Sequence, residues 1–406
     1  MVFGACLFGW SLTNMDQALF GYAIPGIMAE FDIGVDGIGW ILSISFIFAA
    51  VCNLIIGIAA DRFGRKVLFV FCLSFSAFLV GVHSLAPTIV ALTVLRATAF
   101  GFSNGLSPLT NTYVVEAAPA RYRGLIMGFL QCGYPIGWFV ASLIAVPILT
   151  TYGWRFVFLP ALLVVPLAFF IARKLPESAR YEKSHAETAD GLGVFDLSAW
   201  VGHLSMLFEP ALKRRTLTCA AIYFTQGGSY AGSAFYLPTF FHEHRGYGEA
   251  EAAAIVGLSY GIGLVGYVSS AVVGEFFLTR RTTVVIWMTI GAFAFLGLIW
   301  LPQEYWHDVF WFSAMAIFYY GAVGAMTTLT TEIFPTRVRA TAASVCMASG
   351  LVGFSVFPVM VAQMIGVVGW QWAFTTIIFP TILTASAAIY TLDNIKSGID
   401  VDDIAR

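Results

Sequence analysis

The sequence predicts an all-α polytopic membrane protein with twelve transmembrane helices in two pseudo-symmetric six-helix bundles. Three observations carry this prediction. Of the 406 residues, 59% are hydrophobic and only 11% are charged, long apolar runs recur along the chain, and a set of landmarks repeats after 216 residues. A soluble protein keeps about a quarter of its residues charged. Many of the apolar runs reach about 20 residues, which is enough to cross the hydrocarbon core of a bilayer.

The apolar runs are continuous rather than alternating, which favours helices over a β-barrel. We expect twelve spans, at residues 3–29, 38–60, 67–85, 88–115, 124–149, 154–173, 215–241, 252–276, 283–301, 308–331, 340–366 and 370–391.

The basic residues predict the orientation of these spans. Eighteen of the 21 Lys and Arg residues lie in loops after even-numbered spans or in the C-terminal tail. Arg155 and Arg245 lie in the other loops, and Arg96 lies inside a span. Because basic loops stay on the cytoplasmic side, we expect a multi-pass protein of the plasma (inner) membrane with both termini in the cytoplasm.

The composition also excludes several function classes. The net charge of −2 provides no basic surface for nucleic acid, and the six Cys residues fall inside apolar runs, where they act as small hydrophobic side chains. No P-loop, metal-ligand spacing or nucleophile elbow is present. We therefore expect no enzyme activity, no catalytic residue, no cofactor and no metal, and no cleavable signal peptide is predicted.

The longest break between spans lies in the middle of the chain. The expected domains are a bundle at 1–173, a cytoplasmic linker at 174–214, a second bundle at 215–391 and a cytoplasmic tail at 392–406. Apolar residues at helical spacing predict an amphipathic helix in the linker, with a solvated linker as the alternative. These apolar residues are Phe195, Leu197, Trp200, Leu204, Leu207 and Phe208.

The repeat divides the chain into two halves. The pattern E-x-x-P-x-R-x-R occurs at 116–123 and again at 332–339, and Gly153-Trp154 matches Gly369-Trp370 at the same offset. Parallel halves of this kind are typical of transporters that bind the substrate between the halves, near the middle of the membrane.

The stretch GIAADRFGRK, at 57–66, places four charges in the turn between the second and third spans. Gly57 is expected to allow close helix packing, Asp61 to pair with an Arg near a facing helix, and Gly64 to form the tight turn. Arg65 and Lys66 are expected to hold the loop in the cytoplasm.

This stretch resembles the signature of the major facilitator superfamily at every position. With the twelve spans and the repeat, the resemblance covers essentially the whole chain. It implies that the motif belongs to an inner gate that stabilises the outward-open state. The gating residues that the resemblance implies are Gly57, Asp61, Arg62, Gly64, Arg65, Glu116, Arg123, Glu332 and Arg339. The second copy, at 274–281, lacks an acidic residue at the position of Asp61.

Further motifs narrow the resemblance to one branch of the family. The stretch LPESAR at 175–180 is similar to the P-E-S-P-R element that follows the sixth span in the family. Gln131 and Gln226 are similar to sugar-porter positions in the fifth and seventh spans. Thr225 and Ala231 depart from the seventh-span signature of those porters. The chain therefore resembles the neighbouring branch of aromatic-acid/proton symporters and organic-ion transporters.

Two ionisable side chains are expected deep inside the membrane, Asp16 in the first span and Arg96 in the fourth. Such a charge costs about 2.5–3.5 kcal/mol to insert, so it indicates a function. A carboxylate whose cationic partner comes and goes changes its affinity for a proton. We expect Asp16 to carry the proton and Arg96 to pair with it in the empty state, with a purely structural ion pair as the alternative.

Aromatic, amide and hydroxyl side chains on the other spans predict a site for a flat or partly apolar ligand. The expected substrate-binding residues are Arg96, Gln131, Tyr134, Trp138, Asn111, Gln226, Tyr230, Ser233 and Tyr320. The predicted function is import of a small organic anion, an aromatic or other carboxylate, together with a proton by alternating access. The expected partners are this anion, protons and the lipid bilayer, and we expect a monomer. The alternatives are a sugar or polyol porter and a non-transporting nutrient sensor.

Overall fold

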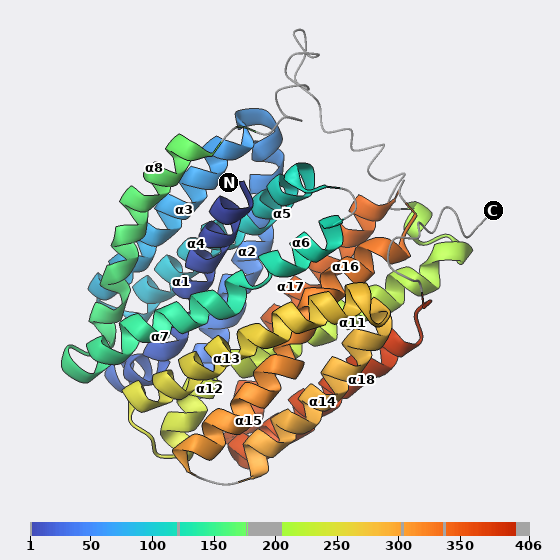
Figure 1. Ribbon diagram of the computed structural model, residues 1–406. Coiled ribbons are helices and arrows are strands. Elements are labelled where there is room, and N and C mark those ends of the chain that lie inside the picture. The colour runs from blue at the N-terminus through green and yellow to red at the C-terminus, as the bar shows by residue number, and fades with distance from the viewer. Residues whose placement is uncertain are drawn as a thin grey trace. The chain divides into compact units, whose positions relative to one another are not determined.

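Every regular element in the part of the chain described by the computed structural model is a helix (Figure 1). The structure describes residues 2–119, 122–175, 177, 205–301, 304–335 and 338–394. The predicted amphipathic helix of the linker lies mostly outside these residues. Of its apolar positions, Leu207 is buried and Phe208 is exposed.

The first half of the chain forms helices that match the first six expected spans. They are α1 (Val2–Phe31), α2 (Val35–Phe63), α3 (Arg65–Val82) with η1 (His83–Leu85), α4 (Ile89–Asn104) with α5 (Leu106–Ala117), α6 (Arg123–Leu130) with α7 (Gly133–Thr151), and η3 (Trp154–Leu163) with α8 (Val164–Lys174).

The second half repeats this order of spans. Its helices are α11 (Pro210–Ala234) with α12 (Leu237–Thr239) and η4 (Phe240–His244), α13 (Glu249–Phe276), α14 (Arg280–Trp300), α15 (Tyr305–Phe318) with η5 (Tyr320–Ala322) and α16 (Val323–Ile333), α17 (Arg339–Ala373), and η6 (Phe374–Ile378) with α18 (Phe379–Tyr390).

Twelve spans account for these helices, as the sequence predicted. Nine stretches of the described residues are long and apolar enough to cross a bilayer, and one of them, Thr341–Tyr390, contains two spans. Gly369 divides it, because its φ of 80° and ψ of 171° break the helix inside α17. The remaining two spans are α1 and α11, whose hydropathy is lowered by polar residues such as Asp16 and Gln226.

Glycines with positive φ mark the predicted landmarks of the chain. Gly153 and Gly369, which are 216 residues apart, both have a φ of 80° and precede the sixth and twelfth spans. Gly64 has a φ of 90° and ends α2 at the point where α3 begins, so the predicted tight turn is confirmed. A residue without a Cβ atom reaches this region at no steric cost.

The chain forms two compact units, and the segments of the two units alternate along the sequence. Unit 1 contains Met1–Pro119, Gly133–Phe195 and Phe235–Gly261, and unit 2 contains Ala120–Cys132, Asp196–Ala234 and Ile262–Arg406. The fifth span is therefore shared, with α6 in unit 2 and α7 in unit 1. The predicted division into bundles at 1–173 and 215–391 stays a prediction.

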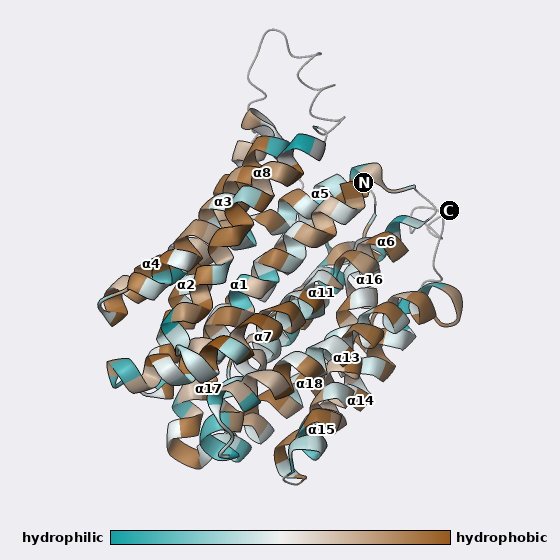
Figure 2. Ribbon diagram, turned by 60° about the vertical axis from the view of Figure 1, so that its left-hand side comes forward, coloured by the Kyte–Doolittle hydropathy of each residue, from teal (hydrophilic) through white to brown (hydrophobic). Residues whose placement is uncertain are grey.

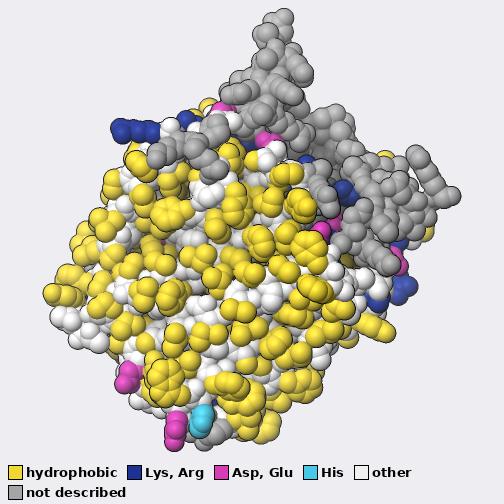
Figure 3. Space-filling model, viewed as in Figure 1, with side chains coloured by type: hydrophobic (Ala, Val, Ile, Leu, Met, Phe, Trp, Pro, Cys, Tyr) yellow, Lys and Arg dark blue, Asp and Glu magenta, His cyan; other side chains and the backbone are white. Residues whose placement is uncertain are grey.

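The exposed side chains are those expected of helices in contact with lipid. On α2, Ile47, Val51 and Leu54 are 57%, 52% and 65% exposed and share one helix face. Hydrophobic residues predominate along the helices (Figure 2), and charged side chains gather near helix ends (Figure 3). By contrast, α1 is buried continuously from Gly9 to Ile27 although it carries polar residues. This buried polar helix is the starting point of the candidate site.

Candidate substrate and coupling site

One face of α1 carries a series of buried polar side chains. Thr13, Asp16 and Gln17 are 0%, 3% and 1% exposed. Residues three and four positions apart share a helix face, so these three lie on the same side of α1 as Phe20. The sequence placed Asp16 in the interior of the membrane, and the structure buries it inside unit 1.

Arg96 of α4 lies next to this face. Its side chain is 2% exposed, and its guanidinium carbon lies 4.2 Å from the ring centroid of Phe20 and 5.0 Å from that of Phe100. A guanidinium over an aromatic face is attracted to the ring electrons, more strongly where water is excluded. The two rings therefore hold a cation in a part of unit 1 where a charge would otherwise be costly.

Several polar atoms at this site have no hydrogen-bond partner among the described residues. They include Oδ1 of Asp16, Nε of Arg96 and both side-chain polar atoms of Gln17. No hydrogen bond joins Asp16 to Arg96 in the described chain, so their predicted pairing stays a prediction. Buried polar groups are normally hydrogen-bonded. Groups that lack a partner within the protein can therefore bind a proton or a polar ligand.

A chain of aromatic contacts continues from Arg96 through unit 1. The ring centroids of Phe100 and Phe46 are 4.9 Å apart, those of Phe46 and Phe235 are 5.7 Å apart, and those of Phe235 and Trp138 are 5.9 Å apart. Trp138 also stacks on Tyr260 at 4.8 Å with an interplanar angle of 21°. These fully buried rings form an apolar wall beside the guanidinium.

The other predicted binding residues of the first half are more dispersed. The Tyr134 ring lies 5.6 Å from that of Trp10 in unit 1. Asn111 is partly exposed on α5. Gln131 is buried at the C-terminal end of α6, which belongs to unit 2. Of the predicted first-half residues, the structure thus brings Arg96 and Trp138 to one aromatic wall and places Gln131 in the other unit.

The predicted binding residues of the second half come together in unit 2. The hydroxyl groups of Ser233 and Tyr320 are 3.2 Å apart, and the Tyr320 ring lies 4.9 Å from that of Tyr230. Tyr319, which was not predicted, lies 2.5 Å from Ser229 Oγ and donates to the Gln226 carbonyl at 3.3 Å. Its position next to Tyr320 was the one signal in the sequence that could have indicated it.

Two of the predicted gating residues form an ion pair in unit 1. Arg65 is 9% exposed and pairs with Glu116. The carboxylate of Glu177 accepts hydrogen bonds from the backbone N–H groups of Arg65 and Lys66, at 3.0 and 3.1 Å, and from the Tyr113 hydroxyl at 3.3 Å. A carboxylate at the N-terminus of α3 also interacts favourably with the helix dipole. We call this end of unit 1 the Arg65 end.

The remaining predicted gating residues of the first half have different outcomes. A Cβ atom added at Gly57 would meet no atom of the described residues within 4 Å, so the predicted close packing at Gly57 is wrong for this part of the chain. The nearby side chains of α2, including Leu54, face outward instead. The side chains of Asp61 and Arg62 lie outside the described residues. Arg123 begins α6 and is exposed.

Unit 2 contains a related ion cluster that the sequence did not predict. Arg280 is 5% exposed and pairs with both Glu275 and Glu332. The second copy of the motif lacks the acidic residue at the position of Asp61, but Glu275 lies close enough to pair with Arg280. Arg339 donates through Nε to the Phe334 carbonyl at 3.2 Å.

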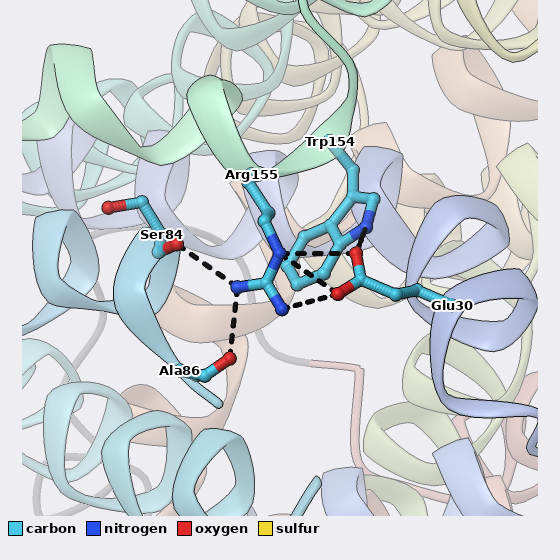
Figure 4. Close-up of polar contacts among 5 residues, drawn as sticks. All are labelled: Glu30, Ser84, Ala86, Trp154 and Arg155. Carbon is cyan, nitrogen blue, oxygen red and sulfur yellow. Dashed lines mark hydrogen bonds and ion pairs between the residues drawn. The ribbon is translucent and has the colours of Figure 1, made fainter. Parts of the chain in front are cut away.

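Three segments meet at the opposite end of unit 1, which we call the Glu30 end (Figure 4). Arg155 donates to the Glu30 carboxylate, with Nε 3.1 Å from both oxygens, and to the carbonyls of Ser84 and Ala86 at 3.0 and 2.9 Å. Trp154 Nε1 donates to Glu30 Oε2 at 2.9 Å. Glu30 lies just beyond the first expected span, and its hydrogen bonds with Arg155 lower its pKa.

A profile described as Major Facilitator Superfamily matches residues 6–327 of the chain. The chain belongs to the Major Facilitator Superfamily. Membership confirms the resemblance inferred from the signature motif, and it makes the protein a multi-pass membrane transporter rather than an enzyme.

The chain is similar to several bacterial transport proteins, to two of them over more than four-fifths of its length. It is 27% identical over 377 residues to the niacin transporter NiaP of Acinetobacter baylyi, which covers 88% of this chain and 85% of the relative. It is 28% identical over 353 residues to the cis,cis-muconate transport protein of the same organism, covering 85% and 83%. The 4-hydroxybenzoate transporter PcaK of Pseudomonas aeruginosa is 30% identical over 176 residues, 42% of this chain and 38% of the relative.

Solved structures share the fold at lower sequence identity. A D-xylose–proton symporter matches with a TM-score of 0.73 and 18% identity, covering 98% of this chain and 99% of the other. A bacterial homologue of the human lysosomal transporter Spinster, in an inward-facing and unoccupied conformation, matches with a TM-score of 0.65 and 17% identity, covering 96% and 94%. These similarities support the twelve-helix fold.

Proposed function

We propose that this transporter is a secondary-active symporter that imports a small organic anion, an aromatic or other carboxylate, together with a proton. The observation that carries the proposal is the buried guanidinium of Arg96. It lies over the rings of Phe20 and Phe100, 4.2 and 5.0 Å from their centroids, and shares a buried polar site with Asp16.

Arg96 is the proposed binding group for the substrate carboxylate. A guanidinium stays charged at physiological pH and can donate two parallel hydrogen bonds to a carboxylate. The rings of Phe20 and Phe100, with the aromatic wall that continues to Trp138, suit a flat apolar portion of the same ligand. One site thus recognises both the charge and the planar body of an aromatic acid.

Asp16 is the proposed proton carrier. Its buried Oδ1 has no hydrogen-bond partner among the described residues, so a proton can be held there without breaking a bond within the protein. When Asp16 is protonated, Arg96 is left free to attract the substrate anion. One proton moving with one monoanion transfers no net charge. The membrane potential, worth about 2.3 kcal/mol per charge per 100 mV, then does not contribute to uptake.

The relatives support this class of substrate. Niacin, cis,cis-muconate and 4-hydroxybenzoate are all carboxylic acids, and the first two of these relatives align with more than four-fifths of the chain. The further binding residues proposed in unit 2 are Gln226, Tyr230, Ser233 and Tyr320. Tyr320 contacts both Ser233 and Tyr230, and its neighbour Tyr319 donates to the Gln226 carbonyl.

We further propose that the protein lies in the inner membrane as a monomer, with both termini and the Arg65 end in the cytoplasm. The distribution of basic residues supports this orientation, because 18 of 21 lie in loops assigned to that side. The ion pairs Arg65–Glu116 and Arg280–Glu332 are then proposed parts of an inner gate.

Uptake into proteoliposomes tests the proposal. Purified protein is reconstituted, a pH gradient is imposed, and a panel of radiolabelled acids, sugars and organic cations is offered. We expect a carboxylate to accumulate when the outside is acidic, and we expect Arg96→Gln to abolish binding while Arg245→Gln, in an outer loop, does not. Accumulation of a sugar instead would favour a sugar porter, and binding without net uptake would favour a sensor.

A further inference from the structure

Gln17 of α1 is a buried amide that the proposed mechanism does not use. Its side chain is 1% exposed, and neither its carbonyl oxygen nor its amide nitrogen has a hydrogen-bond partner among the described residues. A buried amide that is kept without a partner inside the protein calls for an explanation. A polar group on a ligand provides one.

The packing of α1 places Gln17 between two walls of unit 1. Phe20 faces α4, because its ring lies under the guanidinium of Arg96. Gly21 faces α7, because a Cβ atom there would lie 3.3 Å from the Trp138 ring. Successive residues of an α-helix are about 100° apart, so Gln17 points between these two directions and lies about 4.5 Å from Phe20 along the helix axis.

Two other buried polar groups of unit 1 also lack partners among the described residues. One is Oγ1 of Thr13, one helix turn from Gln17 on the same face. The other is Nε1 of Trp138, whose ring approaches α1 at Gly21, one turn beyond Gln17, and both side chains are 0% exposed. We call Thr13, Gln17 and Trp138 the Gln17 cluster. It offers a hydroxyl, an amide that both donates and accepts, and an indole that only donates.

We propose that the Gln17 cluster recognises a second polar group of the substrate, distinct from the carboxylate bound by Arg96. This inference rests on the proposed function and adds a specificity to it. The cluster suits a hydroxyl group, a ring nitrogen or a second carboxyl group at a distance from the first. The preferred substrates are therefore planar acids with two polar ends, and an unsubstituted aromatic acid such as benzoate is a poor substrate.

The physical basis is the asymmetry of buried hydrogen bonds. A site built to bond a polar group rejects an analogue that lacks it, because the groups of the protein are then left without partners. An apolar side chain at position 17 removes this penalty for benzoate, and it also removes the favourable bond to a substrate with two polar ends. The substitution should therefore change the ratio between substrates rather than the transport of all of them.

Competition between acids in proteoliposomes tests this inference. Benzoate, 4-hydroxybenzoate and nicotinate are each added as competitors, and the inhibition of uptake of a labelled acid is measured. The proteins compared are the wild type, the Gln17→Leu variant and the Gln17→Met variant. Methionine keeps the length of the side chain and serves if the leucine variant does not fold. Gln363→Leu, at an exposed position on α17, is the matched control.

We expect the wild-type protein and the control to bind 4-hydroxybenzoate and nicotinate more tightly than benzoate by about tenfold or more. This ratio corresponds to about 1.4 kcal/mol. The Gln17 variants should lose most of this preference, because benzoate binds more tightly and the other two acids bind less tightly than to the wild type. An equal loss for all three acids would overturn the inference in favour of a structural role, as would a wild type without any preference. If the wild type transports no acid at all, the proposed function fails first.

Discussion

Replacement of Arg155 by methionine should destabilise the Glu30 end of unit 1. Arg155 joins three segments of the chain, because it donates to Glu30 at the end of α1 and to the carbonyls of Ser84 and Ala86 after α3. Methionine keeps the apolar stem of the side chain and removes every one of these hydrogen bonds.

The expected cost can be worked out from burial. Ala86 is 1% exposed, and Arg155 is the one donor to its carbonyl among the described residues, so this carbonyl is left unpaired at a cost of about 1–3 kcal/mol. The ion pair adds at most about 1 kcal/mol, because its side chains are 28% and 43% exposed and solvent screens the charges. The total is about 1–4 kcal/mol. On the scale of soluble domains of about 150–250 residues, the size of one unit, this lowers the melting temperature by about 2–16 °C.

Thermal unfolding in detergent, followed by tryptophan fluorescence, measures this cost. The repeat supplies the matched control, because Gln371 stands 216 residues after Arg155 and makes one uncharged hydrogen bond, to the Ile299 carbonyl at 3.2 Å. Gln371→Met should cost about 1 kcal/mol or less. If Arg155→Met costs no more than Gln371→Met, the junction of three segments is not stabilised in the way described here.

The same comparison has a predicted pH dependence. Arg155 lowers the pKa of Glu30, so the contribution of the pair is complete above the usual carboxyl pKa and is lost as the pH falls through the lowered folded-state value. The difference in stability between the wild type and Arg155→Met should therefore be larger at pH 7 than below pH 4. A difference that grows on acidification would contradict this assignment.

Two further substitutions probe the helix packing of each unit. Gly257→Val should reduce both stability and uptake, because even a Cβ atom at Gly257 would lie 1.8 Å from Ser142 Oγ and would force α13 away from α7. The control, Gly366→Ala, should be neutral, because an added Cβ atom there meets no described atom within 4 Å. Rescue of Gly257→Ala by Ser142→Gly would support this contact, and failure of rescue would contradict it. Tyr319→Phe should cost about 1–2 kcal/mol of unfolding free energy in denaturant titrations, because it removes the buried bonds to Ser229 and Gln226, whereas the exposed Tyr152→Phe should change nothing measurable.

The spans and the repeat could be predicted because they depend on local properties of the sequence. Hydropathy over about 20 residues is sufficient to place a membrane helix, whatever its neighbours are. The turn at Gly64 was likewise visible, because a positive φ favours glycine at specific positions. The repeat singled out Gly153 and Gly369, and the structure has a positive φ at both. These features do not depend on which helices pack together.

The side-chain contacts could be predicted only in part. The capping of α3 by Glu177 joins residues more than 100 positions apart, as does the junction of Glu30 with Arg155. No local pattern specifies such pairs. The interior charges Asp16 and Arg96 were visible because charge inside an apolar run is unusual, but their geometry was not. Arg96 lies over two phenylalanine rings and has no hydrogen bond to Asp16 in the described chain.

Gly57 illustrates a limit of reasoning from motifs. Its place in a recurring signature predicted a close helix contact, yet a Cβ atom there would lie more than 4 Å from every described neighbour. The close approaches instead occur at glycines outside that motif. At Gly128 of α6, for example, an added Cβ atom would lie 2.7 Å from the Gly324 carbonyl oxygen of α16. Which glycine makes a contact depends on which helices cross, and the local sequence does not contain this information.

The central claim is that Asp16 carries the proton that drives uptake. The most direct test compares Asp16→Asn with the wild type in two assays on the same proteoliposomes, accumulation of a labelled carboxylate driven by a pH gradient, and exchange of the same carboxylate across membranes without a gradient. Asparagine keeps the size of the side chain but cannot take up a proton at this position. We predict that the variant loses accumulation and retains exchange. Accumulation by Asp16→Asn at the wild-type level would show that another group carries the proton.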